Sequence, residues 1–119
     1  MRSAVKNFTF RRGDTPSPLG VRLSGINIRS GAIYVLPRPG DVVTWIIAWP
    51  GDKQTRTTAP NGGLVLDARS KFITWPLTAD DLARLQAGQV APFSIQRTDT
   101  SGFVRTYLTG TISVEDPPV

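Results

Sequence analysis

Short apolar runs separated by glycine and proline constrain this chain more than any other feature. The 119 residues include 11 Gly and 10 Pro, and these recur between apolar segments that are shorter than a typical helix. Glycine and proline interrupt helices and favour turns, so the sequence predicts about seven or eight short strands. We expect one domain spanning residues 1–119, in which residues 115–119 form an extended tail.

Alternation of apolar and polar residues locates most of these strands. In the last strand, the even-numbered residues Val104, Leu108, Ile112 and Val114 should face the core, and Gly110 among them suits a bulge or a close neighbouring backbone. The expected strands are Val5–Phe10, Leu19–Leu23, Ala32–Leu36, Asp41–Trp49, Leu64–Asp67, Lys71–Trp75, Ala91–Thr98 and Phe103–Val114.

Turn-forming residues indicate how the strands connect. Pro37–Gly40 predicts a hairpin that joins Ala32–Leu36 to Asp41–Trp49, and Asp99–Gly102 predicts a second hairpin. The polar segment Pro50–Gly63 is typical of a long mobile loop. Gly25 predicts a bulge or bend, because Ile26 and Ile28 continue the apolar pattern on the opposite parity.

One segment, Thr78–Gly88, is typical of a short helix. Thr78 can cap its start, Asp80 and Asp81 suit the positive N-terminal end, and Gly88 can end it. Leu82 and Leu85 would face the core. The count of elements therefore predicts an all-β fold, a single antiparallel β-sandwich of the immunoglobulin-like kind with one short helical connection. A small barrel is the alternative, because periodicity does not reveal closure.

The residue types that most enzyme chemistry requires are scarce. The chain has no Cys and no His, which removes thiolate chemistry and the commonest general base and metal ligand. Its carboxylates lie mostly in expected turns, where Asp bonds to the backbone. We expect no enzyme activity and no catalytic, cofactor-binding or metal site, although a glycosidase using two distant carboxylates stays open.

The net charge of +5, from 14 Lys and Arg against 9 Asp and Glu, favours acidic partners. The basic residues are spread along the whole chain, however, and only Arg11 and Arg12 are adjacent. We therefore rank nucleic-acid binding last. No apolar run reaches the roughly 18 residues of a membrane-spanning helix, and no signal-peptide pattern opens the chain, so we expect neither a membrane partner nor secretion.

The segment Asp41–Trp49 is apolar on both faces, which predicts a strand covered on both sides. One side would face the core and the other a loop or a partner protein. We take Val42, Trp45, Ile46 and Trp49 as candidate protein-interface residues, since aromatic residues dominate interface hot spots. Alternatively, exposed tryptophans would make the chain a carbohydrate-binding module.

Three segments carry a family resemblance: Ile73–Gly88 (ITWPLTADDLARLQAG), Phe93–Gly102 (FSIQRTDTSG) and Tyr107–Val114 (YLTGTISV). Together they resemble small virion proteins of tailed bacteriophages and prophages, including the N-terminal β-sandwich domain of phage baseplate upper proteins. The opening segment Phe8–Thr15 (FTFRRGDT) is similar to the start of that family.

The resemblance implies location in the virion and assembly instead of catalysis. Such a protein docks on other virion proteins at the baseplate, tail, neck or head surface. It would serve as an adaptor, a decoration protein or the base of a fibre. The resemblance also implies a homo-oligomer or another symmetric assembly.

Overall fold

β-strands are the main secondary structure of the chain, as the alternation predicts. The computed structural model describes residues 4–26, 29–86 and 88–116, and these contain ten strands and one short helix. The elements are β1 (Ala4–Arg11), β2 (Leu19–Val21), β3 (Leu23–Ile26), β4 (Ile33–Leu36), β5 (Val42–Trp49), β6 (Asp52–Thr57), β7 (Val65–Leu66), β8 (Ile73–Trp75), α1 (Ala79–Leu82), β9 (Val90–Thr98) and β10 (Val104–Glu115).

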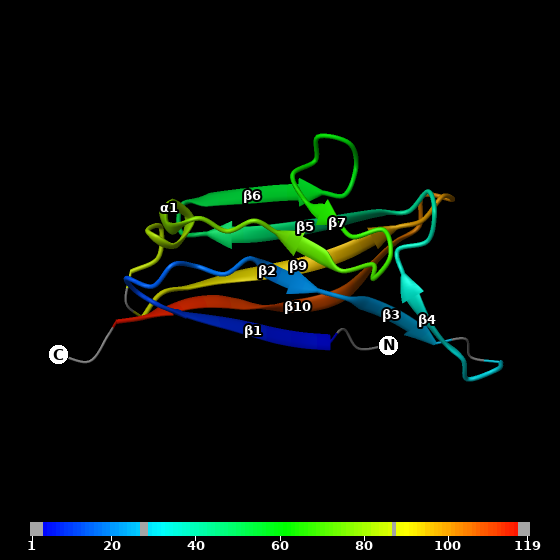
Figure 1. The fold of residues 1–119 in the computed structure, drawn as a ribbon, viewed down its shortest axis with the longest axis horizontal. Helices are drawn as coiled ribbons and strands as arrows, with labels where there is room; N and C mark the ends of the chain where they lie inside the picture. The colour runs from blue at the N-terminus through cyan, green and yellow to red at the C-terminus, as the bar shows by residue number, and fades with distance from the viewer. Residues whose placement is uncertain (1–3, 27–28, 87, 117–119) are drawn as a thin grey trace.

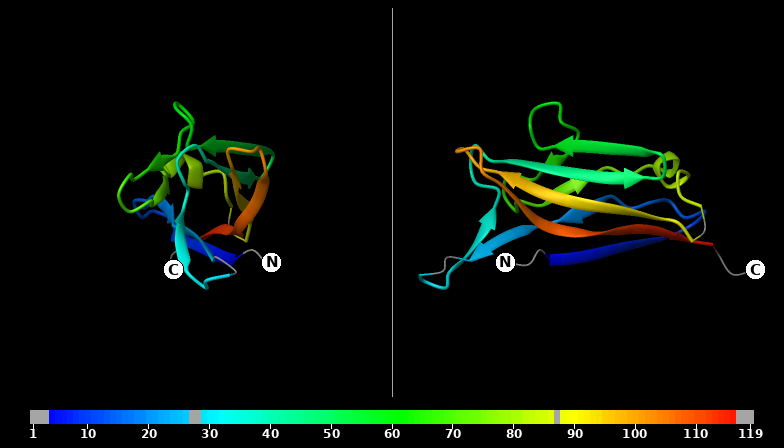
Figure 2. Two further views of the ribbon diagram at one scale, coloured as in Figure 1. Left: turned by 90° about the vertical axis from the view of Figure 1, so that its right-hand side faces the viewer. Right: turned by 180° about the vertical axis from the view of Figure 1, so that it is seen from behind.

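The strands form three sheets. A five-stranded sheet has the order β1-β10-β9-β5-β6, a three-stranded sheet has the order β2-β8-β7, and β3 pairs with β4 in a two-stranded ribbon. The ribbon projects from one end of the molecule, which is 54 Å long, and α1 lies at the other end (Figure 1). The two larger sheets face each other in the end-on view (Figure 2).

One strand pair departs from the expected antiparallel arrangement. β1 runs parallel to β10, with Ala4 opposite Leu108 and Arg11 opposite Glu115. The other named strand pairs are antiparallel. The prediction of a wholly antiparallel fold is therefore wrong at this edge, because the first strand returns beside the last strand in the same direction.

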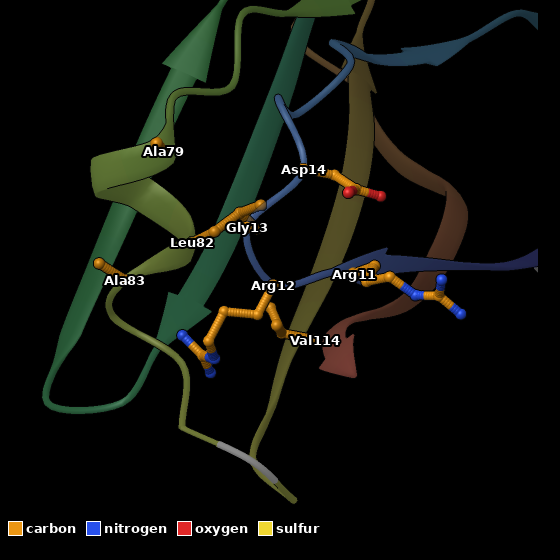
Figure 3. A pocket seen from close by; sticks show the side chains of 8 residues that line it. All are labelled: Arg11, Arg12, Gly13, Asp14, Ala79, Leu82, Ala83 and Val114. Atoms are coloured by element: carbon orange, nitrogen blue, oxygen red, sulfur yellow. The ribbon is translucent and has the colours of Figure 1, made fainter. Parts of the chain in front are cut away.

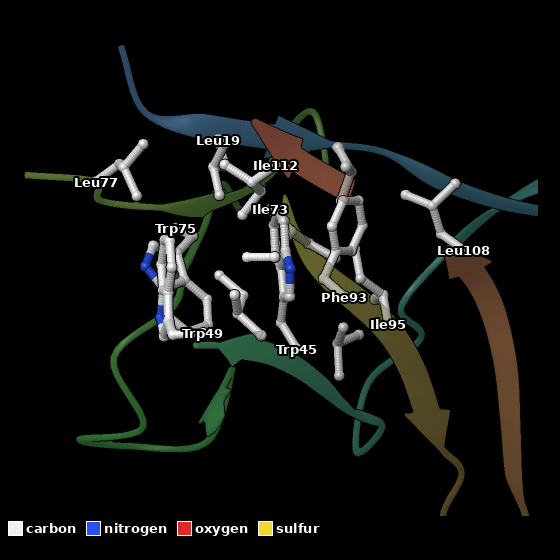
Figure 4. Packing of buried hydrophobic residues seen from close by; sticks show 14 of the residues in the cluster. Leu19, Trp45, Trp49, Ile73, Trp75, Leu77, Phe93, Ile95, Leu108 and Ile112 are labelled. Carbon is white, nitrogen blue, oxygen red and sulfur yellow. The ribbon is translucent and has the colours of Figure 1, made fainter. Parts of the chain in front are cut away.

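The core lies between the five-stranded and three-stranded sheets (Figure 4). Trp45 of β5 is fully buried, and its ring centroid lies 5.8 Å from that of Trp75 on β8 and 5.6 Å from that of Phe93 on β9. The Trp45 and Trp75 rings meet edge to face, the geometry that aromatic pairs favour. These three residues therefore join the two sheets into one core.

The helix is shorter than predicted but begins where expected. Thr78 caps α1, since its hydroxyl accepts from the Asp81 amide at 3.2 Å while the Asp81 carboxylate accepts from the Thr78 amide at 2.9 Å. After Leu82 the chain continues in tight turns, with the Leu85 amide donating to the Leu82 carbonyl. Leu82 and Leu85 are buried, as predicted.

The predicted hairpin around Pro37–Gly40 is wrong. β4 pairs with β3 in the projecting ribbon, because both edges of β5 are already occupied by β6 and β9. The predicted bulge at Gly25 is also wrong, since Gly25 pairs in regular register with Tyr34. Ile28 lies outside the described residues.

The predicted loop Pro50–Gly63 contains a strand. β6 turns back from β5 at Pro50 and Gly51 and pairs along it as an antiparallel edge. Its inward-facing side chains are polar yet cover indole rings: the Gln54 amide oxygen accepts from Trp49 Nε1 at 3.1 Å, and the Arg56 guanidinium lies 4.5 Å from the Trp75 ring centroid. Polarity therefore misidentifies this strand as a loop.

The last strand confirms most of the predicted inward residues. Leu108, Ile112 and Val114 are buried, but Val104 is 52% exposed. The register of β10 against β9 shifts between Thr106 and Leu108, and this bulge changes the parity of the residues before it. The expectation for Val104 is wrong for that reason.

Gly110 faces inward where another backbone comes close, as predicted. A Cβ atom at this position would lie 1.7 Å from the Lys6 carbonyl oxygen of β1. β10 continues to Glu115, so the expected tail 115–119 begins one residue too early, and residues 117–119 lie outside the described residues.

Candidate protein interface

The five-stranded sheet has one face that points toward the core and one that points away from it, and the candidate interface residues lie on its strand β5. Alternation divides β5 cleanly: Val43, Trp45, Ile47 and Trp49 are buried, whereas the residues between them are partly exposed. We call the surface formed by the second set and its neighbours on β1, β10, β9 and β6 the outer face.

The four candidate residues fall on opposite sides of β5. Val42 and Ile46 lie on the outer face and are partly exposed. Trp45 is fully buried and Trp49 is 3% exposed, so both belong to the core and not to a contact surface. The structure therefore brings Val42 and Ile46 to the same surface and separates them from the two tryptophans.

Hydroxyl side chains dominate the outer face. The row across the sheet at Ile46 runs from Thr55 on β6 to Ser94 on β9 and Thr109 on β10. Some of these groups bond to one another between β1 and β10: Thr9 Oγ1 and Ser113 Oγ lie 3.3 Å apart. The hydroxyl residues of the face are Thr9, Thr44, Thr55, Thr57, Ser94, Thr98, Thr106, Thr109, Thr111 and Ser113.

Asn7 on β1 extends this polar network. Its side-chain oxygen accepts from both the backbone amide and the hydroxyl of Thr111, each at 3.1 Å. These bonds hold the parallel edge strand against β10 on the side that faces solvent. The outer face is therefore a continuous, ordered sheet surface across the β1–β10 pair.

Charged side chains lie at the perimeter of the outer face. Among the described strand residues that point outward, Lys53 lies on the edge strand β6, and Arg11 and Glu115 lie opposite each other at one end of the β1–β10 pair. Interface centres are depleted of charge and surrounded by a polar rim. The distribution of charge on this face has that pattern.

Large apolar side chains are exposed on the same face. Val5 on β1 is 71% exposed, and Val90 on β9 and Val104 on β10 are each 52% exposed. A shallow depression near the middle of β5 is lined by Ile46, Ala48, Lys53, Pro92, Phe93 and Ser94. Alternation within β1 and β9 is consistent with the outward positions of Val5 and Val90. Alternation places Val104 inward, because the bulge that turns this residue outward has no recognisable pattern in the sequence.

A second concave region lies at the α1 end of the molecule, between the helix and the turn after β1 (Figure 3). Its walls are apolar at Leu82 and Val114, while Arg11, Arg12 and Asp14 lie at its rim. The Arg12 side chain contacts two other segments of the chain: Nε is 2.8 Å from Asp116 Oδ1, and Nη2 donates to the Leu85 carbonyl at 2.8 Å. Arg12 therefore links the turn after β1 to the segment after α1 and to the residue that follows β10.

The most buried ion pair lies inside the fold, near the ribbon end. Arg97 Nε donates to Asp41 Oδ2 at 2.6 Å, and Arg97 Nη1 donates to the Tyr107 hydroxyl at 3.2 Å. Burial raises the pKa of Asp41, but hydrogen bonds from Arg97 and the Arg38 amide, with the charges of both arginines, outweigh it and hold this pKa below its ordinary value. The pair is structural.

Burial also acts to lower the pKa of Arg97. The hydrogen bonds to Asp41 and Tyr107, with the charge of Asp41, outweigh that effect and raise the pKa above its ordinary value. Arg97 therefore stays charged throughout the physiological pH range.

In the turn after β7, the backbone amides of Ser70 and Arg69 donate hydrogen bonds to the Asp67 carboxylate and lower its pKa.

Among the described residues, no three side chains of the metal-ligating types come together. Within the same ranges, the structure contains no helix of the length and apolarity needed to cross a membrane.

No protein-family model matches the chain. No curated protein matches it either.

Proposed function

We propose that this chain is a structural, non-enzymatic protein of a tailed-bacteriophage particle, and that its outer face is buried against a neighbouring virion subunit. The observation that carries the docking role is the confinement of charge to the perimeter of a face that exposes Val5, Val90 and Val104. A charge-depleted centre with a charged and polar rim is the pattern of protein interfaces. The virion setting rests on the resemblance of Ile73–Gly88, Phe93–Gly102 and Tyr107–Val114 to phage proteins.

We also propose an immunoglobulin-like sandwich of the variable type for the two larger sheets. In that fold, strands G, F, C and C′ share one sheet and strands B, E and D the other. By chain order, β10-β9-β5-β6 corresponds to the first set and β2-β8-β7 to the second. Trp45 on β5 then occupies the position of the buried tryptophan of strand C.

One feature distinguishes this chain from an antibody domain. The sequence has no Cys, so the disulfide between the sheets of antibody domains has no counterpart. The edge-to-face contact between Trp45 and Trp75 joins the two sheets without a covalent link.

The carbohydrate-binding alternative loses the observation on which it depended. Stacking on a sugar ring requires an exposed indole, and Trp45, Trp49 and Trp75 are all buried. Trp49 is also held by Gln54 and covered by the Arg84 guanidinium, 5.7 Å from the ring centroid. The docking function is therefore the one that we carry forward.

Incorporation into particles tests the proposal. Phage particles are purified from a bacterial culture that expresses the chain, and the chain is sought in them by mass spectrometry. Thr44→Lys places a charge on the outer face, and Thr100→Lys, in the exposed turn after β9, is the matched control. We expect Thr100→Lys and the unchanged chain to be incorporated and Thr44→Lys to be lost from particles.

Two results would contradict the proposal. One is the absence of the unchanged chain from purified particles. The other is equal incorporation of Thr44→Lys and Thr100→Lys, provided that thermal unfolding shows both variants to be folded.

A further inference from the structure

We infer that the subunit covering the outer face is a second copy of this chain, related to the first by a twofold axis. The inference rests on the proposed function, in which this face is buried in an assembly, and it names the partner. In a twofold contact, the same patch of both copies meets, so the patch must be complementary to itself.

The distribution of charge permits such a contact. The chain carries a net charge of +5, so two copies repel when their charged surfaces approach. On the outer face, however, Arg11 and Glu115 lie at one end, and Lys53 lies on the edge strand beside the depression that Ile46 also lines. Two copies can therefore meet over β9 and β10 without placing like charges together, which would cost several kcal/mol.

The polar groups at the centre make the face complementary to itself. Thr44, Ser94 and Thr109 carry hydroxyl groups, each of which can donate one hydrogen bond and accept others. A hydroxyl can therefore pair with an identical hydroxyl of a second copy, whereas a carboxylate or an ammonium group requires a partner of opposite charge. Neither kind of charged group stands among these residues.

The size of the face also fits. Its five strands have between 6 and 12 residues each, and alternation turns about 20 of their residues outward. A standard interface uses about 20–30 residues from each partner. The exposed valines Val5, Val90 and Val104 supply apolar area that a second copy would remove from water.

Sedimentation of the purified full chain tests the inference. Ser94→Lys places a charge between Ile46 and Thr109, and Ser17→Lys, exposed in the segment before β2, is the matched control. We expect the unchanged chain and Ser17→Lys to form dimers with the same dissociation constant. For Ser94→Lys this constant should rise by about tenfold or more, because each dimer would bury two like charges.

Single-cysteine variants test the twofold symmetry directly, since the chain has no native Cys. Thr44→Cys, Ser94→Cys and Thr109→Cys are oxidised separately, with Ser17→Cys as the control. In a twofold contact, a position near the axis faces its own copy, so at least one outer-face variant should form a disulfide-linked dimer. Ser17→Cys should not.

The outcomes separate this inference from the proposed function. A chain that is monomeric in sedimentation, or that dimerises equally with Ser94→Lys and Ser17→Lys, overturns the second-copy inference. If the chain does not dimerise through this face but Thr44→Lys alone is lost from particles, the docking function stands and the partner is a different protein. If Ser94→Lys fails to fold, Thr55→Lys on the exposed edge strand replaces it, with Thr100→Lys as its control.

Discussion

The carboxylate of Asp41 is nearly inaccessible to water, and its charge depends on two donors. The Asp41 side chain is 3% exposed, and its Oδ2 atom accepts from Arg97 Nε at 2.6 Å and from the Arg38 amide at 2.9 Å. Burying a charge is costly unless it is paired and hydrogen-bonded. These bonds fix the start of β5 to the end of β9.

The pKa of Asp41 predicts the acid sensitivity of the fold. Because its pKa in the folded chain lies below the ordinary 3.8, the ionised carboxylate stabilises the fold above that pH. This stabilisation is lost as the pH falls through the folded pKa. Chemical denaturation from pH 7 to pH 2 should therefore show the free energy of unfolding declining below about pH 4.

Replacing each partner supplies the control for this prediction. Arg97→Met should lower the free energy of unfolding at pH 7 by about 3–5 kcal/mol, because it leaves a buried carboxylate without its main partner. Asp41→Asn should flatten the decline below about pH 4. An acid profile identical in Asp41→Asn and the unchanged chain would show that other carboxylates set it.

At the scale of elements, Gly110 determines whether β1 can lie beside β10. A Cβ atom at Gly110 would lie 1.7 Å from the Lys6 carbonyl oxygen, which is backbone and cannot rotate away. At Gly20 on β2, the nearest atom to such a Cβ lies 2.3 Å away but belongs to the ring of Phe72, which is partly exposed and can move.

Gly110→Ala and Gly20→Ala therefore form a matched pair. Gly110→Ala should lower the free energy of unfolding by about 1–3 kcal/mol, as for other overpacked sites, and hydrogen exchange should accelerate in β1. Gly20→Ala should cost less. Equal losses for the two variants, or unchanged exchange in β1, would contradict the role given to Gly110.

The strands were largely predictable from sequence, whereas their pairing was not. Alternation is a local property, so β1, β9 and most of β10 follow from it. Which edge a strand joins depends on the rest of the sheet, so β4 pairs with β3 and not with β5. β6 was missed because its inward-facing Gln54 and Arg56 are polar, although they cover indole rings.

The whole molecule depends on one core that both larger sheets share. Trp45 on β5 contacts Trp75 on the opposite sheet and Phe93 on the neighbouring strand. Its Nε1 atom, like that of Trp75, is buried without a hydrogen-bond partner among the described residues. Packing therefore holds these rings in place.

Substitution of Trp45 should accordingly affect the whole fold. Trp45→Ala should lower the free energy of unfolding by about 3–5 kcal/mol, and far-ultraviolet circular dichroism and tryptophan fluorescence should change in a single transition. Ile46→Ala, on the outer face of the same strand, should cost much less. A small loss for Trp45→Ala with two separate transitions would mean that the sheets fold independently.

The candidate site was only half predictable for a related reason. Both faces of β5 are apolar in sequence, so alternation separates Trp45 and Trp49 from Val42 and Ile46 without indicating which set faces the core. The three-stranded sheet decides this, because Trp75 packs against Trp45. The depletion of charge on the outer face becomes visible only when five strands distant in sequence are placed side by side.

The parallel pairing of β1 with β10 also determines how the fold bears mechanical load. Ala4 and Glu115 lie at opposite ends of this strand pair (Figure 1). Tension applied between them would act along the strands and strain the ladder of hydrogen bonds together in shear, not one after another as in peeling. Forced rupture follows the height of the unfolding barrier. Such tension would therefore be opposed by all the hydrogen bonds of the β1–β10 pair at once.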